Sequence, residues 1–590
     1  MFMTSETLSI CRPLYVACLL LFGAWACTNL PVQNQDAANP LPSTPAAASQ
    51  PEAPEVKPPQ RPVIELTQDI LYKLLVAEFA GQRGQLDVSV KYYLELARST
   101  RDPEIAARAT RIAVYARDDQ AASEAAGLWL ELDPDSIDAH QVLAVMEVRK
   151  GDIDAALVHF DHIVKHTDQM LDQKLWVIAN LLGKEQDQTI VRQVMERLMQ
   201  GHENDPEALY AYAHVLSRLN DNDRALEILE KVLGLVPDNV NANISYVSIL
   251  QQQGKTEAAT AWMEKALQRN DKDFNLRMFY ARLLTDEKQF DVARRQFEIL
   301  IAQAPNNTDV LYALGLLYLQ ANRLDEAATY FQRLSTLDQH AGEAAYYLGR
   351  IAEEKGELVQ AANWYQSLAD GVNYFDAQVR LGVILARQGK MDDARRHLQS
   401  IHADNQEQKN ILIQAEAELL TDKKLYKDAM TVYDRALEND PDPDLLYARA
   451  MLAEKMGRLD ILERDLKEII GRDPKHAQAL NALGYTLADQ TNRYQEAYEL
   501  IRKALELSPD DFYILDSMGW VLYRLGRLDE SITYLNKALS VRPDPEIAAH
   551  LGEVLWVKGD KAAAKQIWEA AIKETPKDAR LLDVIKRFNP

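Results

Sequence analysis

The chain has 590 residues, a formal net charge of -23 at pH 7 and a sequence pI near 5.0. Because nucleic-acid binders gain much of their affinity by neutralising phosphates, this charge argues against nucleic acid or an anionic lipid surface as a partner. The composition is 47% hydrophobic but only 8% aromatic, which is typical of an all-helical array, so the length alone does not require several separate domains.

The N-terminal residues have the pattern of an export signal. All three cysteines, Cys11, Cys18 and Cys27, lie in the first 27 residues, so the rest of the chain can hold no disulfide and no cysteine metal site. An arginine precedes the apolar run LYVACLLLFGAWA, residues 14–26, which is short for a membrane span. We therefore expect residues 1–26 to be a cleaved signal peptide.

Two kinds of cleavage fit the end of this signal. The sequence AWAC resembles a bacterial lipobox, in which Cys27 becomes the acylated first residue of the mature protein, although Ala24 stands where Leu is usual. The resemblance implies lipidation of Cys27, and Thr28 in place of Asp implies sorting to the outer membrane, facing the periplasm. The alternative is ordinary secretion, because Ala24-Trp25-Ala26 also satisfies the A-x-A rule.

Residues 27–62 change in character and predict a tether. Nine of the 23 prolines of the chain fall between Pro31 and Pro62, among Ala, Gln and Ser. Such a segment cannot bury enough apolar surface to fold and acts as a semi-rigid spacer. At about 3.1 Å per residue in a polyproline conformation, it could hold the following domain up to roughly 100 Å from a membrane.

From residue 63 onward small residues recur with a period close to 34. Gly484, Gly519 and Gly552 are 35 and 33 residues apart, and an Ala or Ser follows each of them 12 or 13 residues later. Proline recurs late in each unit. The positions that carry the pattern are Gly315, Gly349, Gly382, Gly484, Gly519 and Gly552; Ala327, Ala361, Ala394, Ala497, Ser531 and Ala564; and Pro474, Pro509, Pro543 and Pro576.

Each recurring residue type has a physical role in a pair of antiparallel helices. Two helices approach closely only where neither presents a bulky side chain, which explains the small residues. Glycine in the left-handed conformation ends the first helix, and proline begins the next one because it lacks the N–H that an interior position needs. The mid-unit glycines with the first of these roles are Gly356, Gly389, Gly457, Gly526 and Gly559.

This pattern resembles the tetratricopeptide repeat. The resemblance implies an all-α fold, a solenoid in which helix-turn-helix hairpins form a right-handed superhelix with one long concave wall. We expect about 14 or 15 helix pairs over residues 63–576, a degenerate unit with altered packing near 171–205, and a capping helix at 577–590. The units are expected to begin near Ile70, Pro103, Ile137, Pro206, Val240, Phe274, Thr308, Gly342, Phe375, Asn410, Pro443, Ala477, Phe512 and Pro545.

Two motifs could carry chemistry, and neither supports an enzyme. Gly254 to Thr256, in QGKTE, resembles the end of a phosphate-binding loop, but Ile249 stands where that loop needs glycine. His159, His162 and His166 are spaced three and four apart, as in a helical metal site. Because second helices of such repeats usually face solvent, we expect a solvated face there. We predict no metal, no cofactor and no catalytic residues.

Partner-binding residues can be placed through the resemblance. In repeats of this family the first helix lines the concave wall, chiefly with its second, fifth, ninth, twelfth and thirteenth positions. Tyrosine and tryptophan at these positions supply large contact areas at small entropic cost. The alternative is that these aromatics pack between neighbouring repeats. The candidates are Tyr210, Tyr312, Tyr346, Tyr447, Tyr485, Trp520, Tyr523, Arg524 and Trp556.

The function implied is non-enzymatic. The chain resembles the outer-membrane lipoproteins of this repeat class that deliver cell-wall hydrolases to a carboxyl-terminal processing protease. This implies an adaptor whose partners are proteins, with a membrane contact only through the lipid anchor. The alternative is an assembly or stability factor for an envelope machine, such as polysaccharide export, a pilus or outer-membrane protein insertion. The sequence leaves the oligomeric state and the partner of each repeat open.

Overall fold

The computed structural model describes residues 62, 64–166, 171–185, 187–438 and 441–588, which form 31 helices and no strand. The prediction of an all-α fold is therefore confirmed for this part of the chain. The predicted signal peptide, Cys27 and nearly all of the proline-rich segment lie outside the described residues. Among the helices that are described, none is long and apolar enough to cross a membrane.

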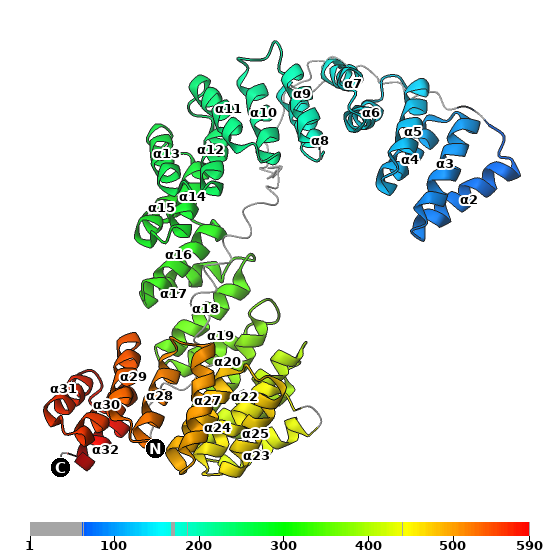
Figure 1. The fold of residues 1–590 in the computed structure, drawn as a ribbon. Coiled ribbons are helices and arrows are strands. Elements are labelled where there is room, and N and C mark those ends of the chain that lie inside the picture. Colours follow the sequence, from blue (N-terminus) through cyan, green and yellow to red (C-terminus); the bar gives the residue numbers. More distant parts are fainter. Residues whose placement is uncertain (1–61, 63, 167–170, 186, 439–440, 589–590) are drawn as a thin grey trace, which may run out of the picture. The chain divides into compact units, whose positions relative to one another are not determined.

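The helices fall into two compact units, and the N-terminal unit ends at Pro305 (Figure 1). Apart from α8 and α9, its helices follow one another as packed pairs, coloured blue to green in the figure. Its helices are α2 (Gln68–Gln82), α3 (Leu86–Thr100), α4 (Pro103–Ala116), α5 (Asp119–Leu132), α6 (Ile137–Lys150), α7 (Ile153–His166), α8 (Leu171–Leu182), α9 (Gln188–Leu198), α10 (Pro206–Arg218), α11 (Asn222–Leu235), α12 (Val240–Gln252), α13 (Thr256–Arg269), α14 (Phe274–Asp286) and α15 (Phe290–Gln303).

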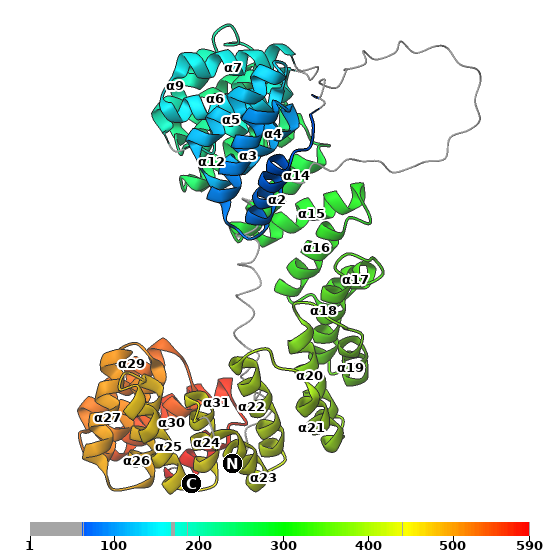
Figure 2. The ribbon, with the colours of Figure 1, turned by 90° about the vertical axis from the view of Figure 1, so that its right-hand side faces the viewer.

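The C-terminal unit begins at Asn306 and continues the same pairing (Figure 2). Its last helix, α32, packs against α30 and α31. Its helices are α16 (Thr308–Gln320), α17 (Leu324–Leu334), α18 (Ala341–Glu354), α19 (Leu358–Gln366), α20 (Tyr374–Arg387), α21 (Met391–Ser400), α22 (Gln406–Asp422), α23 (Tyr426–Leu437), α24 (Pro443–Lys455), α25 (Leu459–Arg472), α26 (Ala477–Gln490), α27 (Tyr494–Leu507), α28 (Phe512–Arg524), α29 (Leu528–Val541), α30 (Pro545–Lys558), α31 (Lys561–Glu574) and α32 (Ala579–Phe588).

The recurring small residues lie where the two helices of a hairpin touch. A Cβ added at Gly519 in α28 would lie 2.5 Å from Leu535 Cγ in α29, which is far inside van der Waals contact. The partner small residue, Ser531, is fully buried and its hydroxyl donates a hydrogen bond to the Gly519 carbonyl at 2.7 Å. The predicted close approach is thus confirmed, and it lets Leu535, which is fully buried beside Gly519, join the apolar core of this region.

The hairpin turns follow the sequence pattern, but the recurring prolines lie in the loop before the next helix and do not begin it; they are Pro474, Pro509, Pro543 and Pro576. All five mid-unit glycines have positive φ, and Asn220 and Asn322 adopt the same conformation in hairpins that lack the glycine. Prolines at the first helical position follow an aspartate cap, as at Asp442, whose carboxylate accepts hydrogen bonds from the backbone N–H groups of the first turn. Local chemistry therefore fixes where most of the first helices begin and end.

One helix start differs from the expectation. The sequence pattern predicts a unit near Asn410, but α22 begins at Gln406 and spans 17 residues. The reason is the cap at Asn405, whose side-chain oxygen accepts a hydrogen bond from the Gln408 N–H at 2.9 Å and starts the helix a full turn earlier.

Packing differs at α8 and α9, the unit whose small-residue pair is missing. In most hairpins the two helices make their main contacts with each other and with the next hairpin. Here α8 packs mainly on α10 and more weakly on α7, while α9 packs on α7 and α6. Without a small residue at the crossing point, two helices cannot approach closely enough to bury each other's inner faces.

Candidate partner-binding surface

The nine candidate residues all lie on first helices, and none is fully exposed. Tyr346 and Trp520 are buried, at 4% and 8% exposure, and the other seven are partly buried. They are Tyr210 on α10, Tyr312 on α16, Tyr346 on α18, Tyr447 on α24, Tyr485 on α26, Trp520, Tyr523 and Arg524 on α28, and Trp556 on α30.

Two of the fifth-position tyrosines form hydrogen bonds to the first helix of the next hairpin. The Tyr210 hydroxyl lies 3.1 Å from Ser245 Oγ, and the Tyr346 hydroxyl donates to Asp376 Oδ2 at 2.6 Å. Burial first, and then the adjacent carboxylate of Asp376, raises the pKa of Tyr346. These side chains therefore join neighbouring repeats.

The other two fifth-position tyrosines stack on histidines that precede the next first helix. Tyr312 lies 5.3 Å from His340 between ring centres, and Tyr447 lies 6.3 Å from His476, both nearly parallel. All four fifth-position tyrosines therefore contact the next repeat, as in the alternative in which these aromatics pack between repeats.

The C-terminal candidates come together around one histidine. The rings of Trp520 and His550 stack with centroids 4.2 Å apart, Tyr523 lies 5.2 Å from Trp520, and Tyr485 lies 6.3 Å from His550. These four side chains come from α26, α28 and α30, three successive first helices. We call them the aromatic cluster: Tyr485, Trp520, Tyr523 and His550.

His550 is held by a buried ion pair. Its Nδ1 lies 2.9 Å and 3.0 Å from the two carboxylate oxygens of Asp516, and both side chains are 10% exposed. Burial alone lowers the pKa of His550, but Asp516, Glu553 and Asp489 outweigh it, so the pKa lies above its ordinary value. The pair joins α28 to α30.

Asp516 and His550 are not among the binding residues predicted from the sequence. One signal could have found them: Asp516 stands at the fifth position, where four other units have tyrosine, and His550 follows it by one repeat period of 34 residues. An acidic residue at a position that is usually aromatic, followed one repeat length later by a histidine, indicates a contact between neighbouring repeats.

Carboxylates surround the aromatic cluster. The Tyr523 hydroxyl donates to Glu553 at 3.2 Å, and burial, with that carboxylate, raises the pKa of Tyr523 to about 12. Burial also raises the pKa of Glu454, where Asp489 adds to the effect. We call the surrounding acids the acidic rim: Glu454, Asp489, Asp516, Glu546 and Glu553.

Helix α32 supplies cations to this rim. Arg580 forms an ion pair with Glu546, and Arg587 lies 3.4 Å from Glu553. Both arginines are more than half exposed, so these pairs are weak in water. Five carboxylates stand against Arg580, Arg587 and His550, with Arg524 and Lys455 nearby, so the rim is close to balanced in charge and its carboxylates are acceptors suited to cationic groups.

The remaining two candidates belong to different surroundings. The Arg524 guanidinium lies 4.8 Å from the Tyr494 ring centre and donates to the Asp489 carbonyl at 3.1 Å. Trp556 packs with Trp568 and Phe588 under α32. Arg524 therefore borders the acidic rim, whereas Trp556 is part of the packing of the last helix.

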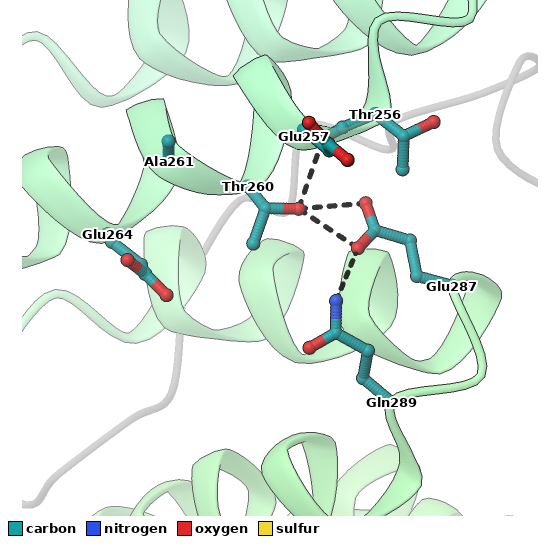
Figure 3. Close-up of a pocket in the computed structure, with 7 residues that line it drawn as sticks. All are labelled: Thr256, Glu257, Thr260, Ala261, Glu264, Glu287 and Gln289. Atoms are coloured by element: carbon teal, nitrogen blue, oxygen red, sulfur yellow. Dashed lines mark hydrogen bonds between the residues drawn. The ribbon is translucent and has the colours of Figure 1, made fainter.

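A separate depression lies in the N-terminal unit, between α13 and the α14–α15 turn (Figure 3). Its volume is about 470 Å³, and Thr260 at its centre donates to the Glu287 carboxylate at 2.8 Å. Thr256 of the QGKTE motif is at its edge. Glu257, Glu264 and Glu287 line it and would repel a phosphate.

The expectation of a solvated histidine face on α7 is wrong for two of its three members. His159 and His162 are only partly exposed, because both contact His140 of α6. Within the described residues no group of His, Cys, Asp or Glu has the geometry of a metal site.

Known proteins resemble the chain through these repeats. Models of the tetratricopeptide repeat match residues 218–283, 281–339, 376–405, 447–512 and 517–579. A TPR repeat-containing protein of Pseudomonas aeruginosa is 38% identical over 488 residues, which are 82% of this chain and 82% of that protein. The chain belongs to the tetratricopeptide repeat family. The predicted repeat type is thus confirmed, and the protein is a scaffold for protein–protein interaction built on a fold that is typically non-enzymatic.

More distant likenesses extend over parts of the repeat array or describe the fold alone. The type IV pilus assembly protein PilF of P. aeruginosa is 24% identical over 152 residues, 25% of this chain and 60% of PilF. The crystal structure of the APC/C hetero-tetramer Cut9–Hcn1 is 15% identical, covers 83% of this chain and 97% of that chain, and has a TM-score of 0.27. A thermophilic TPR protein of Thermus thermophilus is 23% identical, covers 36% of this chain and 96% of that chain, and has a TM-score of 0.26.

Proposed function

We propose that this tetratricopeptide repeat protein is a periplasmic adaptor, held at the outer membrane by a lipid on Cys27, that brings peptidoglycan hydrolases to a carboxyl-terminal processing protease. The adaptor itself performs no chemistry. The observation that carries the binding part of the proposal is the aromatic cluster with its acidic rim, on three successive first helices of the C-terminal unit.

The chemistry of that surface fits a polypeptide with basic side chains. The partly exposed rings of Tyr485 and Tyr523 offer apolar area and faces for cations, and the rim carboxylates that are not buried, Glu454, Asp489 and Glu546, pair with basic side chains of a partner. The rim already binds Arg580 and Arg587 of its own chain, so guanidinium groups suit these positions. The charge of -23 acts in the same direction over the whole molecule.

Adaptor action also requires room for two partners. An array of hairpins in two compact units offers separate surfaces, and holding substrate and protease on one scaffold raises their effective concentration without any new contact between them. A proline-rich tether would keep both partners near the membrane.

The test is a reconstituted degradation assay with the full chain, the protease and a hydrolase, together with separate pull-downs of each partner. The adaptor should speed degradation and show no proteolysis alone. Replacing Tyr485, Trp520 and Tyr523 of the aromatic cluster with Ala should weaken one contact by more than about 2 kcal/mol. Equal cleavage with and without the protein, and no binding of either partner, would reject the proposal.

A control is needed because Trp520 is buried and its loss can loosen the fold. The variant E454Q/D489N removes rim charge while keeping side-chain shape, and it should weaken the same contact with unchanged helicity. Tyr115→Ala, at an exposed tyrosine of the N-terminal unit, should change neither contact.

A second candidate function has one observation in its favour, the likeness to PilF, whose name describes type IV pilus assembly. It is an assembly factor for an envelope machine. Affinity capture from solubilised envelopes separates the two: a serine protease with a peptidoglycan hydrolase supports the adaptor, and export-channel or pilus subunits support assembly. Anchoring is tested by Cys27→Ser, which should release the folded protein from the membrane fraction.

A further inference from the structure

Four histidines of one hairpin in the N-terminal unit form a continuous column. His140 of α6 stacks on His162 of α7 with ring centres 3.8 Å apart, and His162 stacks on His166 at 4.0 Å, both within 14° of parallel. His159 completes the group, because its Nδ1 lies 2.9 Å from His140 Nδ1. We call these four side chains the histidine column.

Hydrogen bonding assigns the tautomers. His140 Nε2 lies 3.2 Å from the Pro134 carbonyl, which can only accept, so this nitrogen carries the proton. In neutral His140 the Nδ1 is then an acceptor, and His159 donates to it through its own Nδ1–H. His166 Nδ1 likewise donates to the His162 carbonyl at 3.2 Å, while His162 Nε2 is buried with no hydrogen-bond partner among the described residues.

Protonation is incompatible with this arrangement beyond the first proton. The contact between His140 and His159 can share one added proton, but with both rings charged two N–H groups would point at each other across 2.9 Å. Two stacked imidazolium rings 3.8 Å apart also repel each other as like charges. Burial already lowers the pKa of His140, His159 and His162 below the ordinary value.

Few charged groups face the histidine column, and they do not offset the free-energy cost of protonating its rings. Asp135, before α6, acts on His140 and His162, and Glu147 of α6 acts on His159, each in favour of protonation but by less than burial opposes it. On the neighbouring elements Asp161 pairs with Lys165 of α7, Lys174 of α8 donates to the Val164 carbonyl, and Arg197 of α9 pairs with Asp154 of α7.

We propose that the histidine column is an acid-sensitive joint, which holds α7 against α6 while its rings are neutral and releases α7 when they become charged. Helix α9 packs on α7, and α8, which packs mainly on α10, contacts α7 more weakly, in the unit where the regular hairpin contact is replaced. Loosening α7 therefore frees the support of α8 and α9 as well.

The sign of the pH dependence follows from the lowered pKa values. At His140, His159 and His162 the native protein binds fewer protons than the unfolded chain, so their contribution to stability is present above about pH 6.5 and is lost as the pH falls through the native pKa values. This expectation does not depend on the proposed adaptor function, because it concerns packing within one unit.

The test is hydrogen exchange of the full chain, followed by mass spectrometry, at about pH 7.5 and about pH 5.5, with labelling times scaled for the intrinsic exchange rate. Protection of α6 to α9 should fall about fivefold or more on acidification, while α12 to α15 stays unchanged. In the variant H162Q/H166Q the fall should be smaller. A matched control, His402→Gln at a histidine whose side chain is 90% exposed, should behave as wild type.

A second measurement keeps the proposal open to refutation if the double variant folds poorly. Returning the acidified wild type to about pH 7.5 should restore protection fully, as expected of a reversible proton switch. Unchanged protection of α6 to α9 at the lower pH would overturn the proposal. Binding of one zinc ion per chain that protects α6 and α7 would also overturn it, because the column would then be a metal site.

Discussion

Two histidines, His140 of the N-terminal unit and His550 of the C-terminal unit, have the same burial but opposite pKa shifts. Counted over the whole residue their exposures are 7% and 8%, so burial lowers both pKa values and cannot explain the difference. The neighbour does: His140 faces other histidines, whereas His550 faces the carboxylate of Asp516 at 2.9 Å. In one repeat fold, the partner across the contact decides whether a buried histidine is stabilised neutral or charged.

The two contacts also connect different parts of the array. The histidine column joins the two helices of a single hairpin, α6 and α7, next to the irregular α8 and α9. The pair of His550 and Asp516 joins the first helices of successive hairpins, α28 and α30, in a region with regular packing. The first contact weakens in acid and affects its own hairpin, and the second strengthens the stacking of repeats.

The largest expected effect comes from Asp516→Asn, which makes the surroundings of His550 resemble those of His140. An uncharged neighbour removes the main group that raises the pKa of His550, so the pKa should fall. Breaking a buried ion pair costs several kcal/mol, and because Asn still accepts a hydrogen bond from neutral histidine we expect about 3 kcal/mol of lost stability. Chemical denaturation, with hydrogen exchange of α28 to α30, measures it.

The matched control is Asp510→Asn. The side chain of Asp510 is 83% exposed and pairs with Lys537 at the surface, where such a pair contributes little. A loss from Asp516→Asn no larger than that of the control would show that the buried pair does not stabilise the contact between repeats.

The next effect tests how far damage spreads in the regular region. In Gly519→Leu, a side chain must fit where a Cβ already lies 2.5 Å from Leu535, and overpacking of this kind costs about 1 to 3 kcal/mol. Because each hairpin is stabilised mainly by its neighbours, hydrogen-exchange protection should fall in α26 to α31 and persist in α2 to α5. An equal loss of protection along the whole chain would contradict the repeat picture.

Much of the regular region could be predicted from the sequence, and the comparison shows why. Residues equivalent to Gly519 and Ser531 stand one repeat length before and after them, and such a period can be seen in a single sequence. The contact between His140 and the histidines of α7 was harder to predict. The sequence pattern placed His159 and His162 on a solvent-exposed face, and His140 of the facing helix was not considered as their partner. Contacts that occur once, such as Asp516 with His550, have no period to reveal them.

A third prediction concerns the sign of the pH response in the two units of the wild type. The raised pKa of His550 means that its stabilisation is complete below about pH 6.5 and is lost as the pH rises through the native value. Burial raises the pKa of Glu418 to about 7 and that of Glu454 above its ordinary value, which acts in the same direction.

Acidification from about pH 7.5 to about pH 5.5 should therefore lower protection in α6 and α7 while it maintains or raises protection in α28 and α30. Both responses can be read from one hydrogen-exchange experiment on the same sample, so the two helix pairs act as controls for each other. A parallel fall in both would indicate a general acid effect and would contradict the opposite shifts of the two histidines.

The smallest expected effects compare two tyrosine hydroxyls, one in each unit. Tyr523 donates to the Glu553 carboxylate at 3.2 Å, whereas Tyr210 is bonded to the neutral Ser245 hydroxyl at 3.1 Å. Hydrogen bonds to charged groups contribute about 1.5 to 3 kcal/mol and neutral ones about 0.5 to 1.5 kcal/mol. Partial exposure lowers both values, so Tyr523→Phe should cost about 1 kcal/mol of folding free energy and Tyr210→Phe about 0.5 kcal/mol.

Urea denaturation of the full chain measures the difference between the two variants. Each variant keeps its aromatic ring, so packing of the ring is controlled. If Tyr210→Phe costs as much as Tyr523→Phe, the charge of the acceptor does not set the strength of contacts between repeats, and the distinction drawn between neutral and charged partners would hold for the histidines alone.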